Sequence, residues 1–333
     1  MNSMLKTMGQ FPIWKYRYNI SRAIEEDYRI KKEEHRKYVE QEKIVIPGIQ
    51  YICSVLLQGP KVDIKSKKII FSEPYLGYLW VSIYFFSMLY EKHILPQNNS
   101  KKRVFIDYSH DFNLLRASLI FRWGRGLRYR YSLWPEGFPP EKGDEEEMRW
   151  AGKTYTLWIR AVSFIFYHEF GHLFLRHSLS NGDALVEMEK DADRFACDIV
   201  IADAENENLK TEALLGVLIL MLSNFFIVNS LREIKPNNHL DLRLRVENIL
   251  DLVDFADESK KEYFYYFAAT IINCLLDEYG VDTKSLPKEY IKAKDYWNDM
   301  CLVLEKQIPP MVVSALFRGF LFLRNIAREN FTH

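Results

Sequence analysis

The sequence lacks a net charge, paired cysteines and a secretion signal, and each absence argues against a class of protein. Lysine plus arginine and aspartate plus glutamate number 45 each, so no global field draws the protein to nucleic acid. The cysteines stand far apart among apolar neighbours and form no CxxC pair. We interpret them as buried hydrophobes in a reducing compartment, which argues against a cysteine-based zinc site. They are Cys53, Cys197, Cys274 and Cys301.

Long apolar runs are also missing. Residues 77–90 and 214–228 are strongly apolar, but both fall short of the roughly 20 residues that cross a bilayer, and Ser82 and Asn224 interrupt them. We interpret both as core helices, with peripheral membrane association as the alternative. Residues 1–20 lack the continuous apolar core of a signal peptide. We therefore expect a cytoplasmic protein.

What is present is ample core-forming material, with 48% apolar and 15% aromatic residues. Residues 44–57 and 61–71 are rich in β-branched residues and are separated by Gly59-Pro60, which predicts a small antiparallel sheet near residues 44–71. From about Tyr75 the pattern is helical almost to the C-terminus. The fold class is therefore α+β, predominantly helical. The expected helices span residues 75–92, 112–124, 149–178, 185–204, 210–229 and 240–254, and a short strand is expected at 104–107.

A loop at residues 131–148 contains three prolines and two glycines. Long loops inside compact domains are often functional. Its two large aromatic residues are Trp134 and Phe138. We expect them to anchor the loop on the body of the protein, with the lining of a substrate cleft as the alternative.

One predicted helix carries a metal-binding motif. The sequence AVSFIFYHEFGHLFLRHS contains H-E-x-x-H, formed by His168, Glu169 and His172. Residues four apart share a helix face, so both imidazoles can bind one ion while Glu169 reaches a water on that ion. Zinc lowers the pKa of such a water, and the carboxylate takes its proton during attack on a peptide carbonyl. The alternative is a pair of hydrogen-bonded core histidines, in an apolar helix where each would need a partner.

A catalytic zinc needs a third protein ligand, and EMEKDADRFACDIV offers one. Glu189, Ala192 and Ala196 share a helix face. The alanines, with Gly171 opposite, would allow this helix to approach the histidine helix closely. We predict Glu189 as the ligand. Asp193, one turn further on, is expected to accept the ring N–H of a ligand histidine.

His239 and Arg245 complete the candidate set. A metallopeptidase benefits from a donor aimed at the developing oxyanion, and His239, at the start of a predicted helix, is a candidate for it. Arg245 would position or neutralise nearby carboxylates. By spacing alone, an exposed loop histidine is the alternative. Tyr155 and Tyr167 are conceivable donors that nothing in the sequence selects.

These segments, in this order, resemble the Lit family of bacterial phage-exclusion peptidases. The matching stretches are GYLWVSIYFFSMLYEKH, AVSFIFYHEFGHLFLRH, EKDADRFACDIVI and NNHLDLRLRVENI. More distantly, the sequence is similar to zinc peptidases that combine HExxH with a later ExxAD, such as the membrane CAAX prenyl proteases. The resemblance implies a zincin-like metallopeptidase core with one Zn²⁺ ion on His168, His172 and Glu189, and Glu169 as general base and acid.

The resemblance also matches Asp193 to the aspartate of ExxAD. His239 and Arg245 look like a His-Pro segment that ends in arginine, although Leu240 stands where that pattern has proline. The family's prototype is an intracellular endopeptidase that cleaves elongation factor Tu when a phage peptide is present. The implied partner is therefore a protein or peptide substrate.

We predict three regions: a charged N-terminal helical extension at 1–43, a zincin-like metallopeptidase domain at 44–255, and a C-terminal helical region at 256–333 packed on the core. Three other functions stay open. They are a zinc-bound sensor that binds a partner peptide without turnover, a helical scaffold without metal, and a membrane-associated peptidase. The intact Glu169 favours an enzyme over a sensor, because a binding module has no need of a base.

Overall fold

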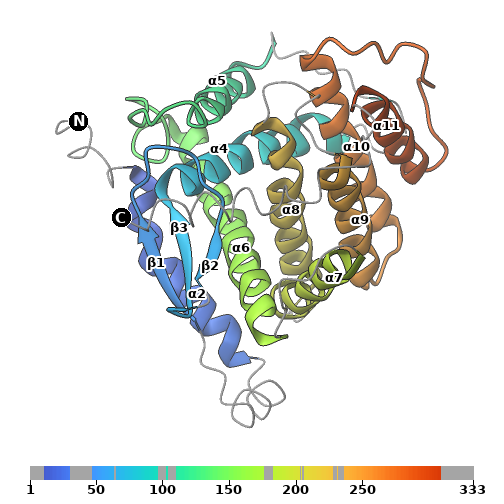
Figure 1. Ribbon diagram of the computed structural model, residues 1–333. Helices are drawn as coiled ribbons and strands as arrows, with labels where there is room; N and C mark the ends of the chain where they lie inside the picture. Colours follow the sequence, from blue (N-terminus) through green and yellow to red (C-terminus); the bar gives the residue numbers. More distant parts are fainter. Residues whose placement is uncertain are drawn as a thin grey trace.

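The structure, a computed structural model, describes residues 11–30, 47–63, 65–96, 103, 110–175, 183–202, 204, 206–227, 231 and 236–308. These residues form a predominantly helical fold with a small sheet on one side (Figure 1). The strands are β1 (Gly48–Ile52), β2 (Lys61–Asp63) and β3 (Lys68–Ser72). The α-helices are α2 (Arg17–Ile30), α4 (Glu73–Leu89), α5 (Phe112–Gly126), α6 (Glu145–Phe174), α7 (Asp183–Cys197), α8 (Glu207–Ser223), α9 (Pro236–Leu252), α10 (Ser259–Glu278) and α11 (Ala293–Gln307). Short 3-10 or π-helical turns are η1 (Pro12–Tyr16), η2 (Tyr90–Ile94), η5 (Asp198–Ala202) and η6 (Asn224–Ile227).

The sheet is mixed, so the prediction of an antiparallel sheet is wrong in part. Its strand order is β1-β3-β2, with β3 parallel to β1 and antiparallel to β2. The reason is a tight turn inside the second predicted β segment. There the Asp63 carboxylate accepts hydrogen bonds from Lys65 and Ser66, and Lys67 adopts a φ of 51°. This hairpin returns β3 to the centre of the sheet, beside β1.

The six helices predicted between residues 75 and 254 are all present, and the largest differences at their starts are at α6 and α9, which each start four residues earlier than expected. Helix α6 begins at Glu145 because Asp144 and Glu147 form a capping box, in which each side chain accepts the other's backbone N–H at 2.8 and 3.1 Å. Helix α9 begins at Pro236, since proline suits a first helical turn, where its missing N–H has no partner to lose. The strand expected at 104–107 lies outside the described residues.

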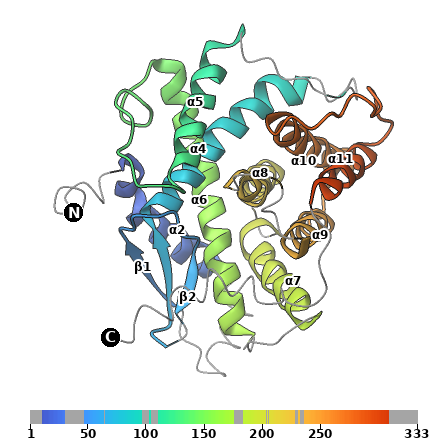
Figure 2. The ribbon, with the colours of Figure 1, turned by 45° about the horizontal axis from the view of Figure 1, so that its top comes forward.

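Helix α4 follows β3 directly and is buried along its whole length. Its first turn is tied to α6, because the indole N–H of Trp158 donates to the carbonyl of Leu76 at 3.2 Å. The apolar stretch at 77–90 is therefore a core helix, as predicted. Figures 1 and 2 both show α4 beside α6.

Helix α8 with η6 is the one helix among the described residues that is long and apolar enough to cross a membrane. It comprises 21 residues with a mean hydropathy of 1.6, and 72% of its apolar window is buried inside the protein. It lies among α4, α6, α9 and α10 (Figure 2). A core helix passes the same test of length and composition, so this feature is weak evidence for a membrane span.

Gly216 allows α8 to approach α6 closely. A Cβ atom at this position would lie 2.6 Å from the carbonyl oxygen of Leu157, a backbone atom that cannot swing aside. We expect Gly216→Ala to lower the free energy of unfolding by about 1–3 kcal/mol, as overpacking does. Gly152→Ala is the control, because this exposed α6 glycine has open space around its Cβ position. It should gain about 0.5–1 kcal/mol, and equal effects in urea unfolding would refute the packing argument.

The N-terminal segment packs into the same core as the rest of the protein. Phe11, Ile20 and Ile24 are buried in it. The backbone N–H of Phe11 donates to the Glu73 carboxylate at 2.9 Å, and Tyr167 donates to the carbonyl of Ile24 at 2.6 Å. Of the charged helical extension expected at 1–43, the structure describes residues 11–30. The division into regions 1–43, 44–255 and 256–333 stays a prediction.

The loop before α6 is anchored by its aromatic residues, as expected. Both are partly buried against the core. The Trp134 ring meets those of Trp80 and Trp123 edge-on, with centroids 5.5 and 4.9 Å away, and the Arg116 guanidinium lies over Phe138.

All four cysteines are free thiols. Cys197 and Cys301 are buried, and Cys274 is half-buried. The prediction of burial is wrong for Cys53, which is exposed because it directly follows β1 at an edge of the sheet.

Candidate metal centre

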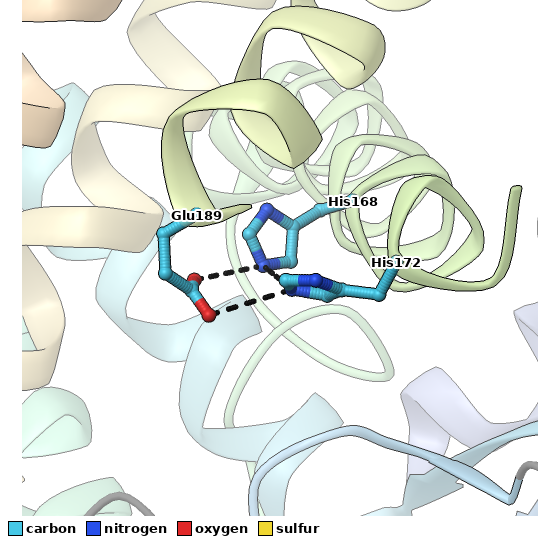
Figure 3. Close-up of side chains that lie close together, drawn as sticks. All are labelled: His168, His172 and Glu189. Carbon is cyan, nitrogen blue, oxygen red and sulfur yellow. Dashed lines mark hydrogen bonds and ion pairs between the residues drawn. The ribbon is translucent and has the colours of Figure 1, made fainter. Parts of the chain in front are cut away.

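The two histidines of the motif point at one carboxylate from the next helix (Figure 3). His168 and His172 come from α6, and their Nε2 atoms lie 3.1 Å apart. Glu189 comes from α7, and its carboxylate oxygens lie 3.3 Å from Nε2 of His168 and 3.4 Å from Nε2 of His172. The structure thus brings the three predicted ligands together.

This cluster fits a zinc ion in both chemistry and size. Two imidazole nitrogens and a carboxylate oxygen form one of the common donor sets of catalytic zinc, with a fourth position left for water. Ligand atoms at about 2.0–2.1 Å from a tetrahedral ion lie about 3.3 Å from one another. The two Nε2 atoms lie 3.1 Å apart, and each lies close to that distance from one oxygen of Glu189, at 3.3 Å from His168 to Oε2 and 3.4 Å from His172 to Oε1. The two histidines thus face different oxygens of the same carboxylate, and one ligand atom from each of the three residues lies within 4.8 Å of the others.

The cluster depends on a close approach of α6 and α7. A Cβ atom at Gly171 would lie 3.2 Å from Cα of Ala192 and 3.3 Å from the ring of Phe195. Ala192 and Ala196 are fully buried. Small residues on both sides therefore let the two backbones meet, as their spacing predicts, and this places Glu189 opposite the histidines.

Asp193 and Arg245 hold the outer side of His168. The Asp193 carboxylate lies 2.8 Å from Nδ1 of His168. It also accepts two hydrogen bonds from the Arg245 guanidinium on α9, both at 2.7 Å. A ring that donates its Nδ1–H to Asp193 keeps its Nε2 lone pair for an ion. Arg245 also lies 3.7 Å from Glu189, so its charge balances both carboxylates.

Burial and charge pairing shift the pKa values of these groups in opposite directions. Burial lowers the pKa of His168, but the hydrogen bonds with Asp193 and Glu189 outweigh it and raise this pKa to about 10. Burial would raise the pKa of Glu189, yet His168 and Arg245 hold it well below its usual range. The pKa of Asp193 is likewise lowered against its burial, chiefly by Arg245. A metal ion binds neutral imidazole, so it must displace a tightly held proton here.

The structure describes some of the remaining candidate residues and not others. Glu169 is half-buried on α6 between the two histidines in sequence. His239 lies in the first turn of α9, but its side chain is outside the described residues, so its role stays a prediction. Tyr167 donates to Ile24, and the hydroxyl of Tyr155 accepts a hydrogen bond from Asn19 at 2.7 Å, so both are engaged away from the site.

A helix with H-E-x-x-H beside a carboxylate from a second helix is the ligand arrangement of a metallopeptidase. The family model described as Peptidase U49 matches residues 69–268, which is more than half of the chain and includes all the candidate residues. The chain therefore belongs to the peptidase U49 family of Lit-like peptidases, and it is a peptidase. No curated protein and no solved structure matches it. The zincin-like core stays a prediction.

Proposed function

We propose that the protein is a zinc-dependent endopeptidase that hydrolyses a peptide bond in an intracellular protein substrate. The observation that carries the proposal is the convergence of His168, His172 and Glu189 at separations suited to one zinc ion. Membership of a peptidase family indicates that the reaction is the hydrolysis of a peptide bond. Glu169 supplies the base that the reaction needs.

In the proposed mechanism each side chain has one task. A bound zinc ion would supply a water of lowered pKa and polarise the substrate carbonyl. Glu169 accepts the proton of that water during the attack and delivers it to the leaving amine. Asp193 fixes the ring of His168 in the orientation that exposes Nε2, and Arg245 fixes Asp193.

The setting is proposed from the resemblance to the Lit family. A cytoplasmic protease with elongation factor Tu as its first candidate substrate, acting in phage exclusion, fits that resemblance. Specificity resides in the surfaces around a site and not in its catalytic core, so the substrate is tested separately from the metal.

Zinc content tests the metal site directly. We expect the purified protein to hold about one equivalent of zinc after gel filtration, and His172→Ala to hold little, because one of three protein ligands is gone. His110→Ala is the control, since this exposed histidine lies outside the cluster and its loss should leave zinc unchanged. Less than about a tenth of an equivalent in folded parent protein would favour the metal-free scaffold.

A further inference from the structure

Helix α9 brings Arg245 to the candidate metal centre, and it lies between two other helices. On one side is α7, whose Asp193 and Glu189 carboxylates lie within reach of the Arg245 guanidinium. On the other side is α11, as Figures 1 and 2 both show. The contacts that fix α9 between these two helices therefore also fix the guanidinium that holds Asp193.

The described part of α9 packs on the core through one apolar face. Val246 and Leu250 on this face are fully buried. Successive residues of an α-helix are about 100° apart, so Arg245 stands on one flank of the face, while Arg243 and Glu247 stand on the other. Burial of apolar surface is non-directional, so it holds the helix on the core but sets its rotation about its own axis only loosely. The directional contacts on the two flanks set that rotation.

Arg243 is held on the α11 side through all three nitrogens of its guanidinium. Its Nε donates to Glu247 at 3.1 Å, within α9 itself. Its Nη1 donates to Glu305 at 3.0 Å and its Nη2 donates to Asn298 at 3.1 Å, and both of these partners belong to α11. The indole N–H of Trp297, also on α11, donates to Glu247 at 3.0 Å. A planar guanidinium with three partners fixes direction as well as distance, which a single point charge does not.

A small rotation of α9 would separate Arg245 from the candidate metal centre. Side-chain tips lie roughly 6 Å from a helix axis, so a rotation of about 20° moves them by about 2 Å. The two hydrogen bonds from Arg245 to Asp193 measure 2.7 Å, and a displacement of that size would break them. The ring of His168, whose Nδ1 lies 2.8 Å from the Asp193 carboxylate, would then lose the fixed orientation that this carboxylate gives it.

We propose that Arg243 is a positioning residue of the metal centre, whose contacts with α11 fix the rotation of α9 at which Arg245 reaches Asp193. Helix α11 begins at Ala293, beyond the end of the family match at residue 268, so this support for the site comes from outside the matched segment. The effect on zinc rests on the proposed function, whereas the effect on the contact of Arg245 with Asp193 does not.

Arg243→Met tests the assignment, because it removes the guanidinium and keeps an unbranched apolar stem. A competitive zinc titration should give an affinity about 3- to 30-fold weaker, the range found for residues that act on a site through others. Arg243→Lys is a second variant that keeps the positive charge between Glu247 and Glu305 and so protects folding. One ammonium cannot replace three directed N–H groups, so zinc affinity should fall here too. An unchanged affinity in Arg243→Lys would overturn the assignment.

Arg125→Met is the matched control. Arg125 is also a half-buried arginine that joins separate elements, because it donates to the carbonyl of Phe226 in η6 at 2.9 Å and pairs with Glu278 of α10. Its loss should lower stability and leave the zinc affinity of the folded protein unchanged. A fall in zinc affinity equal to that of Arg243→Met would show that general loosening, and not the rotation of α9, weakens the site.

A double-variant comparison separates positioning from a merely structural role. With Arg245→Met in place, Arg243 has no guanidinium left to position, so Arg243→Met should weaken zinc binding no further, and additive losses would overturn the assignment. A second readout needs no metal. In urea unfolding of metal-free protein, Arg245→Met should lower the midpoint less in the Arg243→Met background than in the parent. Equal losses in both backgrounds would overturn the assignment of Arg243, whereas absence of zinc from the parent would overturn the proposed function.

Discussion

Glu169→Gln is expected to leave zinc bound and to slow peptide hydrolysis by a factor of about 10²–10⁴, which is the usual contribution of general acid–base catalysis. Glutamine has nearly the shape of glutamate, so the packing of α6 around the half-buried side chain should be preserved. It cannot accept the proton of the attacking water. The measurement is the rate of appearance of cleaved substrate, beside zinc analysis of the same preparation.

Glu187→Gln is the matched control for this change. Glu187 lies on α7 with its side chain 67% exposed and paired with Lys190, away from the cluster, so its neutralisation should alter neither zinc content nor rate. A Glu169→Gln variant that cleaves as fast as the parent would refute the role of Glu169 as base. A zinc-bound parent without turnover on any protein tested would favour the zinc-bound sensor.

Asp193→Ala is expected to be the most destabilising change in the site. Asp193 is 1% exposed and holds the guanidinium of Arg245 with two hydrogen bonds of 2.7 Å. Removing it leaves a poorly solvated charge on Arg245, and breaking a buried ion pair from one side costs about 3–5 kcal/mol. Zinc affinity should also fall about 10- to 100-fold, because the ring of His168 loses its acceptor. Urea unfolding and a competitive zinc titration measure the two effects.

Asp191→Ala supplies the comparison, since this exposed aspartate is on the same helix and should change stability by no more than about 0.5 kcal/mol. The double variant Asp193→Ala, Arg245→Ala removes both charges. It should be more stable than Asp193→Ala alone, because the charge of Arg245 no longer lies in a poorly solvated position without Asp193. If the double variant is the less stable of the two, the loss arises from packing and not from the unpaired charge.

The candidate site was predictable as far as it is encoded by helical spacing. His168 and His172 are four residues apart, and Ala192 follows Glu189 by three, so helical periodicity alone places each group on one face. The contact of α6 and α7 at Gly171 was also predictable, because Gly171, Ala192 and Ala196 are small. The sequence also predicts that Arg245 lies near carboxylates, but it does not say which ones. That Asp193 is the main partner depends on how α9 packs against α7.

What depends on contacts distant in sequence was not predictable. The order of the strands depends on a turn at residues 65–67, inside a stretch that the sequence predicts as one continuous β segment.

The N-terminal segment has a consequence for where the folding unit begins. The family match starts at residue 69 and the predicted domain at residue 44, yet Phe11 and Ile24 belong to the shared core. A shortened chain that began at either point would uncover apolar surface on α4 and α6. It would also deprive Tyr167, the residue just before His168, of the carbonyl of Ile24. The segment that the family model matches is thus shorter than the segment that the motif helix α6 needs for its full packing.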